Sequence, residues 1–153
     1  MKDICIIISA FKKNAIIPDQ LVKNLAGETL IQRAINLSKK ILDKKDIYII
    51  TDSQEISLIA ERNNINFKYD SKLNIPPKDI LKNPEYIFAS CAKKYKSFLL
   101  YRANAPLLNT KIIIDAISYF KKNSEMTIVS VKKEEHRLFK EDNGDLKMLF
   151  MDG

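Results

Sequence analysis

The chain has 153 residues, of which 46% are hydrophobic and 29% are charged, and its formal net charge is +7. This length suits one domain with a proper core, and the composition is that of an ordinary globular protein. We expect a cytoplasmic protein without a membrane partner, because no apolar run could span a bilayer and no signal-peptide core begins the chain. The positive charge suggests nucleic acid as one partner to consider. The lysines, however, are scattered along the chain as pairs, which favours solvated faces over a nucleic-acid groove.

The first predicted strand is the apolar run Ile-Cys-Ile-Ile-Ile at residues 4–8. A run that is apolar on both alternating faces is typical of a strand in a parallel sheet covered by helices. A long basic loop follows it, and the next helical pattern starts only near Thr29. Ligands of open α/β sheets lie outside the carboxyl ends of the strands, so we interpret this loop as a ligand loop rather than an ordinary connection.

The rest of the chain alternates between helical and extended patterns. This alternation predicts an α/β fold of three layers, in which a mostly parallel sheet carries helices on both faces. Residues 70–82 are predicted to be irregular and mobile. The predicted helices are residues 29–42, 52–64, 83–94 and 109–120, and the predicted strands after the first are residues 47–50, 65–69, 98–101, 126–131 and 146–151, the last of them after a hairpin turn at residues 142–145.

Three helix starts carry residues that can cap a helix. Thr29 precedes the first helix, and Asn83-Pro84 has the cap-then-proline order of a helix start. Asp52, followed three residues later by Glu55, has the spacing of a capping box at the second helix. Asp52 could also bind a metal ion or a ribose, but the capping role already explains it, and we favour the cap.

The two cysteines and the single histidine form no metal-ligand pattern. Cys5 and Cys91 stand alone in elements that are predicted to be buried, so we expect free thiols in a reducing compartment. His136 follows the predicted fifth strand, and a lone histidine is more often structural than catalytic. The chain also lacks a paired-carboxylate cluster and a Ser/His/Asp arrangement, which leaves hydrolase chemistry without support.

The loop after the first strand has the cations of a phosphate site but not the glycines. Glycines let backbone N–H groups approach phosphate oxygens, and none lies before residue 24. Lys12 and Lys13 could hold a triphosphate as point charges, or they could be solvated loop lysines. Arg102 and Asn104 follow the fourth strand at the same edge, where Arg102 could bind a phosphate or a sugar carboxylate, or form a surface ion pair.

Several segments match one known family in their order and spacing. They are residues 16–31, Thr51-Asp52-Ser53-Gln54-Glu55-Ile56, Ala105-Pro106-Leu107, Val129-Ser130-Val131, Glu135-His136 and residues 142–147. On these segments the chain resembles the acylneuraminate cytidylyltransferases (CMP-sialic acid synthetases) and, more distantly, the CMP-Kdo synthetases.

The resemblance implies a glycosyltransferase-A-like α/β fold and the transfer of CMP from CTP to an acidic sugar of the sialic acid or Kdo type, with release of pyrophosphate. It implies Mg²⁺ as the cofactor, CTP and the sugar as ligands, and a homodimer or a partner domain as the assembly. The nucleotide would lie against Ala10, Phe11, Lys12 and Lys13, with both lysines also in the catalytic role. The residues near the sugar would be Arg102, Asn104 and His136.

The chain departs from the family in its phosphate loop and its length. Phe11 stands where the family has an arginine, Ala15 where it has a lysine, and lysines replace the glycines. Asn104 stands where the Kdo-type enzymes carry a metal-binding aspartate, so the metal ligands are unknown. We expect residues 1–153 to form one nucleotidyltransferase-like domain, either cut from a longer chain or a short relative of the family. The alternative function is a catalytically inactive binding or scaffolding module.

Overall fold

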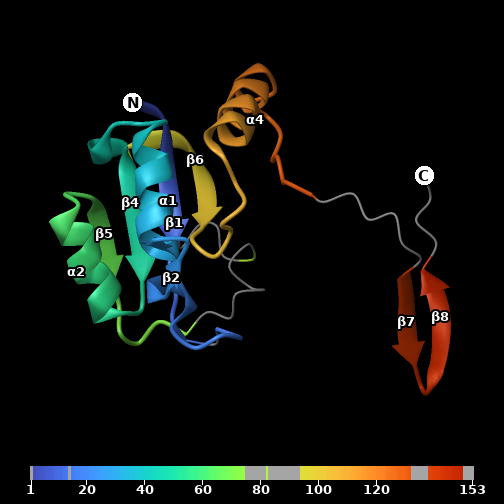
Figure 1. The fold of residues 1–153 in the computed structure, drawn as a ribbon. Coiled ribbons are helices and arrows are strands. Elements are labelled where there is room, and N and C mark those ends of the chain that lie inside the picture. The colour runs from blue at the N-terminus through green and yellow to red at the C-terminus, as the bar shows by residue number, and fades with distance from the viewer. Residues whose placement is uncertain (1, 14, 75–81, 83–93, 132–137, 150–153) are drawn as a thin grey trace.

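The central strand of the fold is β1 (Lys2–Ser9), which lies inside a four-stranded parallel sheet of order β5-β4-β1-β6 (Figure 1). The computed structural model describes residues 2–13, 15–74, 82, 94–131 and 138–149. The other strands of this sheet are β4 (Ile47–Thr51), β5 (Asn66–Tyr69) and β6 (Tyr95–Arg102). The sheet therefore confirms the parallel α/β architecture and the first four predicted strands.

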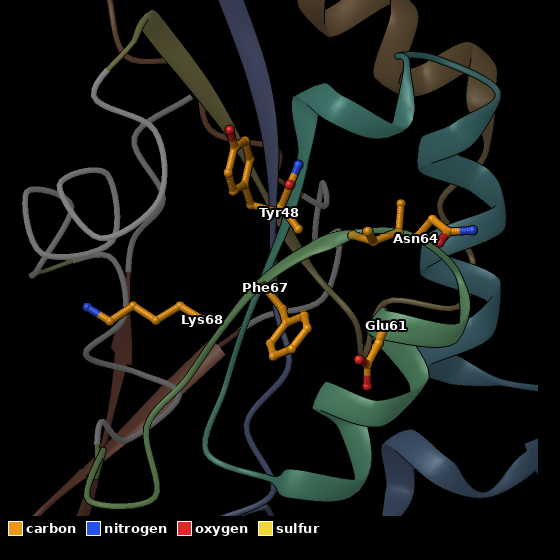
Figure 2. Close-up of a pocket in the computed structure, with 7 residues that line it drawn as sticks. Tyr48, Glu61, Asn64, Phe67 and Lys68 are labelled. Carbon is orange, nitrogen blue, oxygen red and sulfur yellow. The ribbon is translucent and has the colours of Figure 1, made fainter.

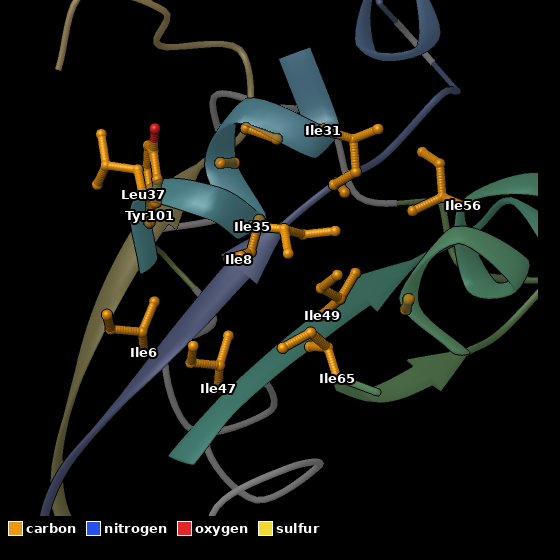
Figure 3. Packing of buried hydrophobic residues seen from close by; sticks show 14 of the residues in the cluster. Ile6, Ile8, Ile31, Ile35, Leu37, Ile47, Ile49, Ile56, Ile65 and Tyr101 are labelled. Atoms are coloured by element: carbon orange, nitrogen blue, oxygen red, sulfur yellow. The ribbon is translucent and has the colours of Figure 1, made fainter. Parts of the chain in front are cut away.

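The helices α1 (Leu30–Lys39), α2 (Gln54–Arg62) and α4 (Thr110–Lys122) all contribute to one core cluster. Figure 3 shows isoleucines from β1, β4, α1 and α2 meeting in this cluster. Alternate residues of β1 point to it, because successive side chains of a strand face opposite sides of a sheet. Its members include Ile6, Ile8, Ile31, Ile35, Ile47, Ile49, Ile56 and Ile113.

A second cluster covers the opposite face of the sheet. It contains Cys5 and Ile7 from β1, Ile50 from β4, and Leu73 and Tyr95. Cys5 is a buried thiol, as predicted, and its Sγ donates to the carbonyl oxygen of Ser97 at 3.9 Å. The helix predicted at residues 83–94, which would belong to this second face, and its Cys91 lie outside the described residues.

Of the three predicted helix caps, the one at Thr29 is confirmed, and Asn83 lies outside the described residues. Thr29 accepts a hydrogen bond from the Gln32 N–H at 3.2 Å. The Asn109 side chain accepts one from the Ile112 N–H at 3.0 Å, at the start of α4. The cap assigned to Asp52 is wrong.

The residue that caps α2 is Ser53, whose hydroxyl accepts the Ile56 N–H at 3.4 Å. Ser53 is one residue closer to the helix than Asp52 and has the extended backbone that a cap requires. The Asp52 carboxylate is therefore available for other donors.

The C-terminal part of the described chain differs from the prediction at one strand. Residues 126–131, predicted as the fifth strand, form no strand, and Val129 and Val131 are exposed. The run has the composition of a strand, but a strand also needs a neighbouring backbone to pair with, and among the described residues this run has none.

The predicted hairpin turn is confirmed. β7 (Leu138–Asp142) and β8 (Asp145–Leu149) pair across Asn143 and Gly144, which both have positive φ. Two such residues match the two-residue turn that suits the twist of a hairpin. None of the described helices is long and apolar enough to cross a membrane.

One small element before α1 was not predicted. β2 (Asn24–Leu25) and β3 (Glu28–Thr29) form a short hairpin whose turn residues, Ala26 and Gly27, have positive φ. The Asn24 side chain accepts the Gly27 N–H at 2.8 Å, which closes the turn. Short 3-10 turns at Gln20–Val22 and Lys44–Asp46 complete the connections.

Candidate functional site

The candidate site lies at the edge of the sheet where the parallel strands end. Ser9, the last residue of β1, pairs with Ile50 of β4 and with Arg102 of β6. The segments that follow these strands therefore leave the sheet side by side. In open α/β sheets this edge is where ligands bind.

The Asp52 carboxylate holds the loop that follows β1. One of its oxygens accepts the backbone N–H of Lys12 at 2.7 Å, and the other accepts the N–H of Lys13 at 2.9 Å. Asp52 is only 8% exposed. A buried carboxylate with two N–H donors is well satisfied, so Asp52 determines the path of this loop.

The Lys12 ammonium group lies between two other carboxylates. Its Nζ is 2.6 Å from Asp19 and 2.8 Å from Glu55. The hydrogen bond to Asp19, followed by the one to Glu55, raises the pKa of Lys12 above its ordinary value. Lys12 is therefore charged at neutral pH, but its charge is already met by protein groups.

Lys13 points to the other side of the loop. Its Nζ donates to the backbone carbonyl of Ser71 and, at 3.4 Å, to that of Leu73. These carbonyls belong to the segment that follows β5. Lys13 thus ties the loop after β1 to the loop after β5.

The start of the loop is anchored by Thr51, which is fully buried at the end of β4. The Thr51 hydroxyl donates to the carbonyl oxygen of Ala10 at 2.7 Å and accepts the Ser53 N–H at 3.0 Å. Ala10 is itself buried in the first core cluster, and Phe11 packs against the second. Ala10 and Phe11, two of the four residues predicted to contact a nucleotide, therefore pack the base of the loop.

The remaining predicted site residues are distributed as follows. Arg102, half-buried, ends β6 beside Ser9, and Asn104 is exposed in the turn that follows. Both lie at the carboxyl edge, as the sequence predicts. His136 lies outside the described residues.

The described residues do not gather a metal site. Within this part of the chain, no group of three or more histidine, cysteine, aspartate or glutamate side chains is arranged to hold a metal ion. The carboxylates of Asp19, Asp52 and Glu55 bind Lys12 and the loop amides instead. These described side chains therefore do not fit a protein-held Mg²⁺.

Sequence reasoning missed the contributions of Asp19, Asp52 and Glu55 to this loop. Asp52 offers one signal, because it directly follows a buried strand at the edge where ligands bind. Its contacts, however, bridge about 40 positions of sequence. Asp19 and Glu55 carry no pattern that would pair them with Lys12.

A pocket elsewhere on the surface is a weaker candidate. It lies along the edge strand β5 and is lined by Tyr48, Glu61 and residues 64–68, with Phe67 and Lys68 on different sides of the strand (Figure 2). Tyr48 and Asn66 belong to the amino-terminal halves of their strands. The lining extends along β5 to Lys68, and none of the lining residues belongs to the loop after β1.

The Lys12–Asp19 pair makes a prediction about titration. The pKa of Asp19 is lowered from its ordinary value of 3.8, chiefly by the hydrogen bond and charge of Lys12 and to a smaller extent by Lys23. We expect Lys12→Met to raise the pKa of Asp19 toward 3.8, as followed by NMR of the carboxyl carbon. A lowered pKa in the folded state stabilises the fold at neutral pH, and this contribution is lost as the pH falls through that pKa. Lys23→Met should raise the pKa of Asp19 less, and an unchanged pKa of Asp19 in Lys12→Met would contradict the pairing of Lys12 with Asp19.

Comparison with known proteins places the fold. No protein-family model matches the chain, and no curated protein matches it. Among solved structures, CMP:2-keto-3-deoxy-manno-octonic acid synthetase complexed with CTP matches with a TM-score of 0.60 and 8% identity, over 80% of this chain and 49% of that chain. A cytidylyltransferase from Leptospira borgpetersenii serovar Hardjo-bovis matches with a TM-score of 0.62 and 16% identity, over 80% and 50%.

The chain therefore has the α/β fold of cytidylyltransferase structures. It spans about half the length of the two structures that it matches. At these identities the likeness concerns the fold alone. It agrees with the resemblance to CMP-Kdo synthetases at that level, and the closer resemblance to the sialic acid enzymes stays a prediction.

Proposed function

We propose that this chain is a cytidylyltransferase-type domain that transfers CMP from CTP to an acidic sugar of the sialic acid or Kdo type. The observation that carries the proposal is the shared fold with a synthetase complexed with CTP, together with two lysines in the loop at the carboxyl edge. A hydroxyl of the sugar would attack the α-phosphate of CTP. The bond between the α-phosphorus and the oxygen that bridges to the β-phosphate would break, and pyrophosphate would leave.

The residues of this chain would act by position and charge. Lys12 and Lys13 would neutralise the triphosphate, and Arg102 and Asn104, one strand along, would lie near the sugar. Such catalysis depends mainly on holding the reacting groups in place. His136 remains a candidate for the same sugar-binding role.

The alternative function is a non-catalytic module that keeps the fold. One observation favours it: the Lys12 ammonium is already bound by Asp19 and Glu55, and the loop amides are bound by Asp52. A triphosphate would have to replace these contacts. The alternative predicts that no turnover occurs with any acidic sugar.

A calorimetric titration tests the proposal. We expect CTP with Mg²⁺ to bind, and ATP, GTP and UTP under the same conditions to bind at least about tenfold more weakly, a difference of about 1.4 kcal/mol. Pyrophosphate release should then be measured with sialic acid and Kdo as acceptors. Selective binding without release supports the non-catalytic module, and the absence of binding by every nucleotide contradicts the proposal.

A further inference from the structure

Two neighbouring backbone N–H groups, those of Lys12 and Lys13, converge on one anion. Their distances to the two Asp52 oxygens are 2.7 and 2.9 Å. Consecutive N–H groups that converge in this way form an anion-binding concavity of the kind that holds phosphate oxygens in other proteins. In this structure the anion is a carboxylate of the chain itself.

The ammonium groups of the two loop lysines also have partners within the protein. Lys12 faces the carboxylates of Asp19 and Glu55, and Lys13 faces two backbone carbonyls. The carboxylates of Asp19 and Glu55 therefore bind the Lys12 ammonium, while Asp52 binds the two N–H groups. A polyphosphate that approached the loop in this arrangement would meet donors that already have partners, and carboxylates that repel it.

We propose that Asp52 is an internal competitor of phosphate, and that a phosphate group binds the loop only after Asp52 releases the N–H groups of Lys12 and Lys13. The inference rests on the proposed function in one respect, namely that the natural ligand is the phosphate chain of a nucleotide. The competition itself concerns any polyphosphate.

Release of Asp52 breaks neither the cap of α2 nor the hydrogen bond at the base of the loop. Ser53, not Asp52, caps α2, and the buried Thr51 hydroxyl holds the base of the loop through Ala10. The carboxylate can therefore leave the amides by rotation of its own side chain or by a shift of residues 11–13. No hydrogen bond of α2 is lost in either case.

The consequence for affinity follows from a two-state equilibrium. A ligand that binds only the open loop has an apparent affinity reduced by the fraction of molecules in which the loop is open. Removal of the Asp52 carboxylate raises that fraction. The same removal would lower the affinity if Asp52 instead held the loop in its binding conformation.

The experiment uses inorganic tripolyphosphate as the probe, titrated calorimetrically into wild type, Asp52→Asn and Asp52→Ala. We expect both variants to bind tripolyphosphate at least about tenfold more tightly than wild type, because the Asp52 carboxylate no longer closes the loop. Asp43→Asn is the matched control. Asp43 is exposed and pairs with Lys45, and its substitution changes the net charge equally.

Tighter binding in the Asp52 variants alone supports the inference. Equally tighter binding in Asp43→Asn would mean that the effect comes from net charge, and it would overturn the inference. Weaker binding in folded Asp52 variants, or no binding by any of the proteins, would also overturn the inference. Wild type gives a second measurement that requires no variant. Saturating tripolyphosphate must shift the NMR amide signals of Lys12 and Lys13, and binding that leaves both signals unchanged overturns the inference.

The same titrations separate this inference from the proposed function. Tripolyphosphate that binds more tightly to the Asp52 variants, with no preference for CTP and no pyrophosphate release, supports the competition and contradicts the cytidylyltransferase. Selective CTP binding that is unaffected by Asp52 substitution supports the cytidylyltransferase and contradicts the competition.

Discussion

Replacement of both Lys12 and Lys13 with alanine is expected to abolish CTP binding. Each charge-assisted hydrogen bond to a phosphate oxygen contributes about 1.5–3 kcal/mol. The loss of two such bonds should therefore weaken binding by about 100-fold or more, since about 1.4 kcal/mol corresponds to a factor of ten. Calorimetry with CTP and Mg²⁺ measures the change, and circular dichroism reports whether the variant is folded.

The matched control is the double substitution Lys121→Ala and Lys122→Ala. These two lysines are exposed in the last turn of α4, and their removal changes the net charge by the same amount. The control should bind CTP as wild type does, apart from a small effect of screened charge. If the loop variant keeps the wild-type affinity while folded, Lys12 and Lys13 have no part in nucleotide binding.

The single variants distinguish the two lysines. Lys12→Ala leaves Asp19 and Glu55 without their shared cation, whereas Lys13→Ala removes the link to the carbonyls of the loop after β5. Both changes remove one positive charge, but only the first leaves two carboxylates beside the loop without the cation that binds them. We therefore expect Lys12→Ala to weaken CTP binding more than Lys13→Ala does.

The strands β1, β4 and β6 are predictable from the sequence because each contains a short apolar run between polar segments, whereas β5 alternates polar and aromatic residues. The run at residues 4–8 predicts β1 to within two residues at its start and one at its end. Runs of this kind are buried on both faces, which only a sheet covered on both faces provides. The carboxyl edge, and with it the positions of Lys12, Lys13 and Arg102, follows from the parallel arrangement.

The run at residues 126–131 has the same character, and it forms no strand. Local composition reports that a segment favours an extended backbone, but pairing depends on whether another strand edge is placed beside it. Among the described residues, none is placed so. The prediction failed because strand pairing is a tertiary property.

The role of Asp52 shows a different limit of sequence reasoning. Asp52 and Ser53 are both good capping residues, and the spacing to Glu55 favours Asp52. The structure gives the cap to Ser53 and the loop amides to Asp52. The choice depends on donors about 40 residues away, which no local pattern reports.

The substitution Thr51→Val is expected to destabilise the fold by about 2–4 kcal/mol, because two groups lose their hydrogen-bond partner at a buried position. The groups are the carbonyl of Ala10 and the N–H of Ser53. Valine has nearly the shape of threonine, so the change removes the hydroxyl without opening a cavity. The free energy of unfolding in urea measures the effect.

Thr51→Ser is the matched control, because it keeps the hydroxyl and removes a methyl group, which costs about 1 kcal/mol. We expect Thr51→Val to be the less stable of the two. Thr51→Val should also accelerate hydrogen exchange at the Lys12 and Lys13 amides, because the hydrogen bond from Thr51 to the carbonyl of Ala10 anchors the loop that carries them. Equal stability of the two variants would mean that the hydroxyl does not hold the loop. Unchanged amide exchange in Thr51→Val would mean that Asp52 alone determines the path of the loop.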